Sequence, residues 1–308
     1  MSFLKNNFFS KKVTVAVHNG KFHPDDVFVV AILSLYLKKP LQIFRTRDQK
    51  IWSGCDYVCD VGGEYDPAKN HFDHHQVGYD EKRNNGIVYS SAGLIWKEFG
   101  EKICGSAEVA QKIDEKIIQP IDANDNGIDL TKNNFEGISP YNFGDYIYAL
   151  NPLPSEGYKK SMQKFRIAVA EAKKVLEREI QKATEKIAQK KVVETIYKNT
   201  EDKKIIVLDD NYSWTSVLAE YPEPLFVITP DFENTTWHVN AVKKNDTAFE
   251  SKLSFPESWA GLRDEDLQKI STVPDAIFCH KARFIAVAKS KEGAIKLAQL
   301  AIAEVEPR

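Results

Sequence analysis

The first part of the chain alternates short apolar runs of strand length with longer apolar segments of helix length. Residues 13–17 form a β-branched run that predicts a buried strand, and the apolar run after Pro24 predicts a helix over about residues 24–37. Residues 41–47 and the short run before Asp60 have the composition of further strands. This alternation predicts an α/β fold, with a parallel sheet covered by helices on both faces.

The second part begins with a long segment in which charged residues separate apolar positions three and four apart. This spacing predicts one amphipathic helix over residues 162–193. Short apolar strands resume near Lys203, and residues 276–305 predict a hairpin followed by a helix. We therefore expect an N-terminal catalytic domain over residues 1–155, a connecting helix over 156–200 and a smaller C-terminal α/β domain over 201–308.

Composition sets limits on this picture. A chain of 308 residues with 43% hydrophobic residues is globular and long enough for two domains of roughly 150 residues. The net charge of -2 means that any nucleic-acid-binding surface must be local. The four cysteines are scattered without a CxxC pair, which predicts reduced thiols and a cytoplasmic protein.

Targeting segments are not indicated. The first twelve residues lack the apolar core of a secretory signal, and their lack of arginine gives a mitochondrial presequence little support. No apolar run approaches the ~20 residues that a membrane span needs. We expect no membrane partner.

Histidines and acids follow the first strand. His18 comes directly after it, and His23 precedes the predicted helix, whose first turn contains Asp25 and Asp26. Acids in a first turn complement the positive end of the helix dipole, and in isolation this would be a sufficient reason for them.

A second polar group follows a later strand. Asp60 ends a buried run, and the two glycines behind it permit a turn that exposes the acid at the strand tip. Further along comes an Asp-His-His triplet, Asp73, His74 and His75. Loop acids and histidines are often only solvated turn residues, but residues 18–75 contain five of the chain's seven histidines. Oxygen and imidazole ligands without cysteine favour a catalytic site for Mn, Mg, Fe, Co or Zn, and Asp60 is the natural bridge between two cations.

Residues 119–127 can supply another carboxylate. They follow a segment with helical spacing and end in an Asn-Gly turn, so alone they indicate no more than a turn. We favour Asp122 over Asp125 because Asp122 lies closer to the apolar helix that would position it.

Two other segments have alternative interpretations. Residues 86–100 predict a loop entering a helix, where Ser90 or Ser91 would cap the helix or the backbone would bind a phosphate. Residues 129–157 form a long excursion whose aromatic side chains would stack on bases or pack the loop against the domain. We favour capping and packing.

The order of these motifs resembles that of the DHH phosphoesterase superfamily, which includes RecJ-type exonucleases and family II inorganic pyrophosphatases. More narrowly, the chain is similar to the MYG branch, a group described as 3'-to-5' RNA exonucleases. This similarity spans roughly residues 13–300 and is carried by HNGKFHPDD, DVGGEYDP with FDHHQ, SSAGLIWKEFG, IDANDNGI and FPESWAGLRDEDL.

The resemblance implies a pair of metal sites that share Asp60. One site would use His18, His23 and Asp60, and the other would use Asp25, Asp60, His74 and Asp122. It also implies that His75 faces the substrate phosphate, while Asp73 would orient a histidine. Related enzymes begin with two aspartates where this chain has His23 and Asp25, so the nitrogen-richer site favours Mn over Mg.

The resemblance further implies an active site in the cleft between the domains. Related enzymes close a C-terminal domain with basic groups over the metal cluster, which makes Arg263, His280, Lys281 and Arg283 candidates for phosphate binding. The alternative is a hairpin with merely exposed basic residues. Ala286 and Val287 stand where relatives often have glycines, which argues against close approach of the substrate to that backbone.

The function expected from the sequence is two-metal phosphodiester hydrolysis, with RNA degraded from its 3' end to nucleoside 5'-monophosphates. The choice of RNA rests on the resemblance alone. The weak net charge supports the alternative of a small substrate: a dinucleotide, cyclic dinucleotide, short oligonucleotide or pyrophosphate. A non-catalytic regulatory protein is the third possibility, and a homodimer is compatible with the sequence.

Overall fold

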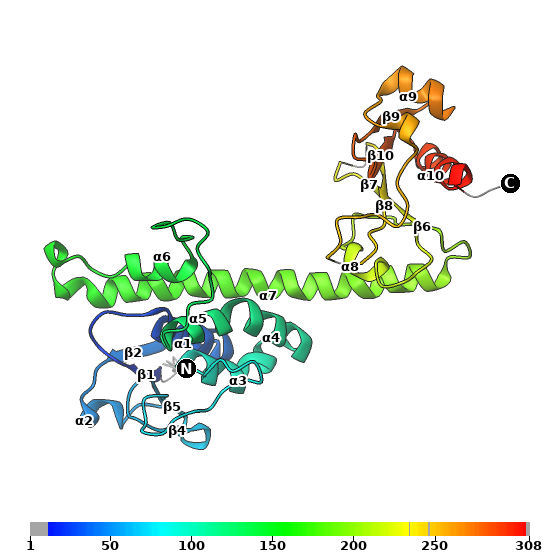
Figure 1. Ribbon diagram of the computed structural model, residues 1–308. Coiled ribbons are helices and arrows are strands. Elements are labelled where there is room, and N and C mark those ends of the chain that lie inside the picture. Colours follow the sequence, from blue (N-terminus) through cyan, green and yellow to red (C-terminus); the bar gives the residue numbers. More distant parts are fainter. Residues whose placement is uncertain (1–11, 234, 246, 306–308) are drawn as a thin grey trace, which may run out of the picture. The chain divides into compact units, whose positions relative to one another are not determined.

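The chain divides into two compact units, residues 1–184 and 185–308. The computed structural model describes residues 12–233, 235–245 and 247–305 (Figure 1). The prediction about targeting segments concerns residues 1–12, and of these only Lys12 lies in the described part. Within the described residues, no helix is both long and apolar enough to cross a membrane.

The N-terminal unit is built on a five-stranded sheet with the order β2-β1-β3-β5-β4. Neighbouring strands are parallel except for the last pair, β5 and β4, which is antiparallel. This confirms the predicted α/β class with a mostly parallel sheet. The strands are β1 (Val13–Val17), β2 (Leu41–Arg45), β3 (Tyr57–Cys59), β4 (Tyr65–Asp66) and β5 (His71–Phe72).

Helix α1 (Pro24–Leu37) forms the crossover from β1 to β2. Its first ten residues are buried, including the two acids Asp25 and Asp26, and the His23 amide donates to Asp26 Oδ1 at its start. It packs against α3 (Ser91–Cys104) and α5 (Gln119–Asp125) (Figure 1). These helices carry polar residues to the edge where β1 and β3 end. The remaining short elements of this region are α2 (Gln49–Trp52), η1 (Pro67–Lys69), α4 (Ala107–Ile113) and η2 (Asp114–Ile118).

The prediction of a turn at residues 119–127 is wrong. Helix α4 continues through the π-helical turn η2 directly into α5, which contains Pro120 in its first turn. The Asn-Gly pair only ends this helix. Asp122 and Asp125 therefore project from one helix.

Residues 129–157 contain α6 (Phe143–Ala149) and η3 (Pro154–Glu156). The prediction that this segment packs through its aromatics holds for Phe143, whose ring meets Phe28 edge-on at 5.9 Å. Phe135 and Tyr141 are exposed. After η4 (Tyr158–Lys160), helix α7 (Ser161–Asn199) extends through the boundary between the units. The long amphipathic helix predicted over residues 162–193 is thus confirmed.

The C-terminal unit has a second five-stranded sheet, β6-β7-β8-β10-β9, in which only β6 and β7 are parallel. Alternate residues of β7 face opposite layers: Phe226 and Ile228 join a core with α10, while Val227 packs with the end of α7 and α8. The predicted hairpin near the C-terminus is formed by β9 and β10. The elements are β6 (Ile205–Val207), α8 (Thr215–Leu218), β7 (Phe226–Pro230), β8 (Trp237–Ala241), η5 (Glu257–Trp259), α9 (Asp264–Ser271), β9 (Ala276–Cys279), β10 (Ile285–Ala288) and α10 (Lys291–Val305).

Candidate metal centre

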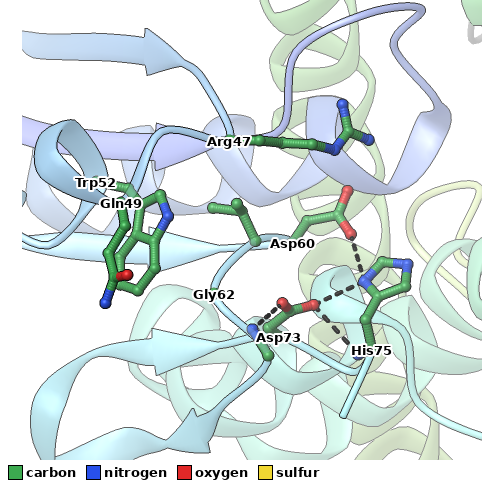
Figure 2. A pocket seen from close by; sticks show the side chains of 9 residues that line it. Arg47, Gln49, Trp52, Asp60, Gly62, Asp73 and His75 are labelled. Atoms are coloured by element: carbon green, nitrogen blue, oxygen red, sulfur yellow. Dashed lines mark hydrogen bonds and ion pairs between the residues drawn. The ribbon is translucent and has the colours of Figure 1, made fainter.

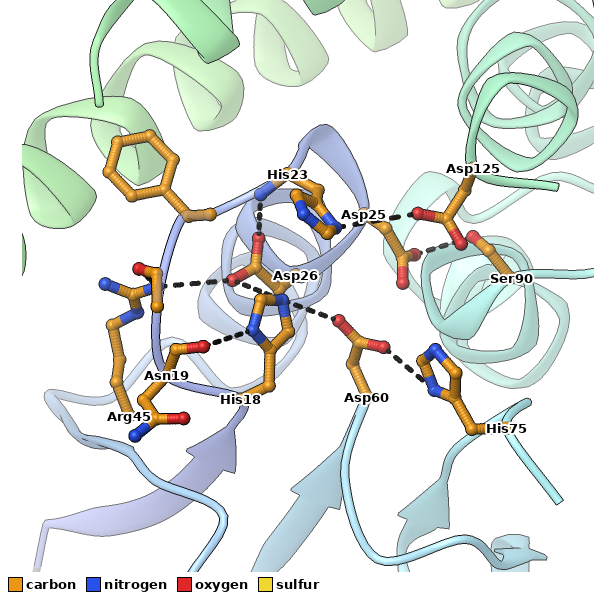
Figure 3. A network of polar contacts seen from close by, with 12 residues as sticks. His18, Asn19, His23, Asp25, Asp26, Arg45, Asp60, His75, Ser90 and Asp125 are labelled. Atoms are coloured by element: carbon orange, nitrogen blue, oxygen red, sulfur yellow. Dashed lines mark hydrogen bonds and ion pairs between the residues drawn. The ribbon is translucent and has the colours of Figure 1, made fainter. Parts of the chain in front are cut away.

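Asp60 lies between two groups of histidines at the end of β3. Its Oδ2 is 3.2 Å from His18 Nε2, and its Oδ1 is 3.4 Å from His75 Nδ1 and 3.7 Å from His74 Nε2 (Figure 3). The backbone at Asp60 has φ 53°, in the left-handed region that non-glycine residues seldom adopt. Such a conformation in a buried residue requires support from its surroundings, and it turns the carboxylate toward both histidine groups.

The first group of potential ligands is buried and consists of His18, Asp26 and Asp60, whose nearest donor atoms lie within 4.8 Å of one another. His18 Nδ1 is 2.8 Å from the Asn19 carbonyl, a contact that fixes the ring and presents Nε2 to the group. Among the described residues, His18 Nε2 and Asp26 Oδ2 are buried without a hydrogen-bond partner. Burial lowers the pKa of His18 to about 4, so the imidazole is neutral and able to bind a cation at neutral pH.

A second group faces the first across Asp60. Its donor atoms come from Asp25, His74 and Asp125, and Asp60 also forms a set with His74 and His75. His74 Nε2 lies 3.3 Å from Asp125 Oδ2. Within the described part of the chain, Asp25 Oδ2 and His74 Nε2 are again buried atoms without a hydrogen-bond partner. Both groups therefore present unused ligand atoms to the space around Asp60.

The carboxylates of the site are crowded enough to resist ionisation. Burial, and then the charges of Asp25 and Asp125, raise the pKa of Asp60 well above its usual value. Burial and the charge of Asp60 do the same to Asp26, and burial with Asp25 raises the pKa of Asp125 to about 7. Bound divalent cations would neutralise this repulsion, and the oxygen and imidazole donors fit Mn, Mg, Fe, Co or Zn.

His75 stands beside the buried groups with its ring oriented by Asp73. The two are joined at 2.7 Å through His75 Nδ1 and Asp73 Oδ1, while Asp73 Oδ2 accepts from the Gly63 amide at 2.6 Å. Burial raises the pKa of Asp73, but the bonds from His75 and Gly63 outweigh it and hold that pKa below its usual value. The bond to Asp73 raises the pKa of His75. The His75 side chain is 61% exposed, so it can meet a substrate phosphate.

Asp122 is held by neighbouring protein groups. Arg83 Nη1 donates to its Oδ2 at 2.5 Å, and the amides of Ser90 and Gly93 donate to its Oδ1. Ser90 Oγ lies 2.5 Å from Asp122 Oδ1 and 2.6 Å from Asp25 Oδ1. One hydroxyl carries one hydrogen, so an ionised Asp25 and an ionised Asp122 cannot both receive it. Burial raises the pKa of Asp122 to about 7, although the charge of Arg83 and the hydrogen bond from Ser90 oppose this shift.

The structure groups the possible ligand atoms differently from the sequence prediction at two positions. Asp125, instead of Asp122, lies with Asp25 and His74, because α5 turns Asp122 inward toward Arg83. Asp26 takes the place given to His23 beside His18 and Asp60. The His23 ring is 5.1 Å from that of His18 and has a 43% exposed side chain, so it lies at the rim of the group.

Ser90 precedes α3 as the N-cap residue, but its hydroxyl makes no capping hydrogen bond. The side chain instead connects Asp25 with Asp122. The interpretation of this serine as a plain cap is therefore wrong. No sequence signal pointed to Arg83, which is 39 residues from its partner. For Asp26 and Asp125 the sequence did contain a signal, since each lies inside one of the motifs, HNGKFHPDD and IDANDNGI.

The other predicted site residues lie on the β9–β10 hairpin and before α9. The Arg263 guanidinium lies over the Phe278 ring at 4.3 Å, and the His280 ring packs against Phe284 at 4.5 Å. Arg283 donates from Nη1 to a backbone carbonyl. Lys281 is exposed. A role for these residues in phosphate binding stays a prediction.

We expect the metal-free protein to lose stability as the pH rises from about 4 to about 7. Asp122 and Asp125 have folded-state pKa values of about 7, above the roughly 3.9 of an unfolded Asp, so the folded state retains protons that the unfolded state has released. The raised pKa values of Asp26 and Asp60 also lower the stability as the pH rises. His18, with its lowered pKa, has the opposite effect on stability below about pH 6.5.

Thermal unfolding with a chelator and with Mn²⁺ measures this effect. The midpoint without metal should fall between pH 5 and pH 7, and Mn²⁺ should raise it more at pH 7.5 than at pH 5, because binding then displaces fewer protons. A midpoint without metal that rises over this interval would contradict the crowding of the carboxylates.

Comparison with known proteins bears on both units. The model of an uncharacterised protein family (UPF0160) matches residues 14–302. The human MYG1 exonuclease is 30% identical over 331 residues, which cover 94% of this chain and 86% of that protein. The MYG1 protein of Schizosaccharomyces pombe is 29% identical, with 94% of this chain and 97% of that protein covered. For the MYG1 protein of Chlamydia pneumoniae the identity is 32%, with 94% and 96% covered. The resemblance seen in the motifs is confirmed, and the chain belongs to the MYG1 exonuclease family.

Proposed function

We propose that this protein is a metal-dependent phosphodiesterase that hydrolyses RNA from its 3' end with two divalent cations. The observation that carries the proposal is the position of the Asp60 carboxylate, whose two oxygens lie near separate histidines, Oδ2 near His18 and Oδ1 near His74. A carboxylate in that position can be shared by two cations. The names of the human and bovine relatives, both MYG1 exonuclease, support a nucleic-acid substrate.

In this proposal His18, Asp26 and Asp60 would hold one cation, with His23 at the rim. Asp25, Asp60, His74 and Asp125 would hold the other. Bound divalent cations would supply an activated water and offset the charge of the phosphate. Imidazole in both groups favours Mn over Mg.

The protein's own groups orient the substrate around these cations. His75, fixed by Asp73, would donate a hydrogen bond to the phosphate, and its raised pKa favours the charged form that does so. We assign phosphate binding to Arg263, His280, Lys281 and Arg283 of the C-terminal unit, as the sequence predicts. Release of nucleoside 5'-monophosphates, an active site formed with the C-terminal unit, and a cytoplasmic location are parts of the same proposal.

A direct test compares a 12-mer RNA with a dinucleotide at several salt concentrations in the presence of Mn²⁺. Hydrolysis of the 12-mer one nucleotide at a time from the 3' end, with 5'-monophosphates as products, would support the proposal. Faster turnover of the dinucleotide with weak salt dependence would instead favour a small-substrate phosphoesterase. The net charge of -2 supports that second candidate, because a long strand needs several cationic contacts.

The ligand assignment gives a matched pair of variants. Asp125→Asn removes a carboxylate of the second group and should lower Mn²⁺-dependent kcat/KM about 100-fold or more, beyond the roughly 10–100-fold typical of an outer-sphere partner. Asp122→Asn retains an oxygen for Ser90 and should cost about tenfold, at the low end of that range. Steady-state kinetics with metal analysis of both variants measures this difference. A larger loss of kcat/KM in Asp122→Asn than in Asp125→Asn would instead indicate that Asp122 is the ligand.

A further inference from the structure

A pocket opens beside the metal centre, between helix α2 and the glycine turn that follows Asp60. Its volume is about 430 Å³, in the lower part of the range of roughly 300–1,000 Å³ found for ligand pockets. Trp52 and Gln49 of α2 border one end, and Asp60 and His75 border the other (Figure 2). The pocket therefore connects directly with the groups assigned to the phosphate.

The indole of Trp52 is held in place by its neighbours. Gly62 has φ 103° and no side chain, and a Cβ there would lie 3.6 Å from the indole edge, so the indole edge faces this turn. His71 meets the indole edge-on at 6.4 Å. Asp48 caps α2 by accepting from the Lys50 amide. An aromatic ring fixed in this way loses little conformational entropy when a flat ligand stacks on it.

The remaining lining is polar and suits the rest of a nucleotide. Gln49 is exposed and offers both an amide donor and an acceptor. Arg47 donates from Nη1 to the Asn19 carbonyl and side chain at 2.5 and 2.6 Å, which uses that one nitrogen of its guanidinium. A guanidinium has five N–H donors, so Nε and Nη2 add donors at the edge of the pocket. The pocket thus has an aromatic end and a charged end.

We propose that this pocket binds the terminal nucleotide of the substrate, with its base against Trp52 and its phosphate at His75 and at the cations that Asp60 would hold. The inference rests on the proposed phosphodiesterase function and adds the site that holds the nucleotide to be released. Stacking on an aromatic ring accepts every base, because each base has a π face, so the pocket gives affinity without sequence preference. One nucleotide fits the volume, which suits removal of single nucleotides.

Calorimetric binding to the full-length, Mn²⁺-loaded protein tests the pocket without catalysis. Adenosine 5'-monophosphate should bind about tenfold or more tightly than ribose 5-phosphate, which lacks the base. Trp52→Leu, which keeps apolar packing against Gly62, should abolish this preference, and Trp52→Phe should retain most of it. Lys50→Ala on the same helix, outside the pocket lining, is the matched control and should behave as wild type. Thermal unfolding shows whether each variant is folded.

Hydrolysis of short RNAs provides a second test of the pocket. Short RNAs with a normal or an abasic 3'-terminal residue should differ about tenfold or more in kcat/KM for the wild type and be equal for Trp52→Leu. If the wild type hydrolyses RNA but does not distinguish the base in either assay, the pocket proposal is overturned and the proposed function stands. If it binds the monophosphate through Trp52 but hydrolyses no RNA, the pocket stands and the proposed function fails. A base preference that survives in Trp52→Leu also overturns the proposal.

Discussion

Replacing Asp60 by Asn is expected to abolish metal-dependent hydrolysis while stabilising the metal-free protein. The loss should exceed about 100-fold in kcat/KM, because a carboxylate that lies near both ligand groups is neutralised. The same loss of charge should stabilise the metal-free protein. The raised pKa of Asp60 means that its charge is costly in the folded state without a cation, and Asn carries no charge.

Thermal unfolding with and without Mn²⁺, alongside activity, measures both effects. The wild type should gain about 3 kcal/mol for each cation bound at a Mn²⁺ concentration 100 times its dissociation constant, and the variant should gain less at that concentration. Asp80→Asn, on an exposed loop position, is the control and should change neither property. An Asp60→Asn protein that keeps its activity would exclude the catalytic role. A wild type that binds metal without hydrolysing any phosphodiester would favour the regulatory alternative.

Replacing Arg83 by Met is expected to destabilise the protein by about 3–5 kcal/mol at pH 8, because it leaves the buried Asp122 carboxylate without its cationic partner. The cost should be smaller at pH 6. Arg83 opposes the effect of burial on the pKa of Asp122, which is about 7 with the guanidinium present, and its removal raises that pKa further. Below pH 7 both folded proteins hold the proton, while above it only the variant does, so the difference in stability grows with pH.

Denaturant unfolding at the two pH values measures this difference. The double variant Arg83→Met/Asp122→Asn should recover much of the stability, since it removes the buried charge together with its partner. Arg83→Lys should recover less, because lysine cannot bind Asp114 and Asp122 with a planar fork. A cost below about 1 kcal/mol that is equal at both pH values would show that Asp122 does not depend on Arg83.

The sequence was sufficient to predict those elements and site residues whose positions depend on the local apolar pattern or on the end of a strand. Strand β1, helix α1 and helix α7 follow from apolar spacing alone. His18 and Asp60 come together because they follow parallel neighbouring strands, whose carboxyl ends meet at one edge of the sheet. Their proximity was predictable without any knowledge of the rest of the fold.

The choice among neighbouring acids was not predictable in the same way. Whether Asp122 or Asp125 faces the histidines depends on the phase of α5, which the π-helical turn before it shifts by a fraction of a turn. The partners of Asp122 are 32 and 39 residues away, at Ser90 and Arg83. Such contacts are set by packing between α3, α5 and the loop before them, and hydrophobic periodicity contains no information about them.

Anomalous diffraction at the manganese edge, from crystals grown with Mn²⁺, tests most directly whether Asp60 is shared by two cations. We predict two peaks roughly 3.5–4 Å apart, both within bonding distance of Asp60, one beside His18 and the other beside His74. A single peak, or two peaks of which only one contacts Asp60, would contradict the two-metal site.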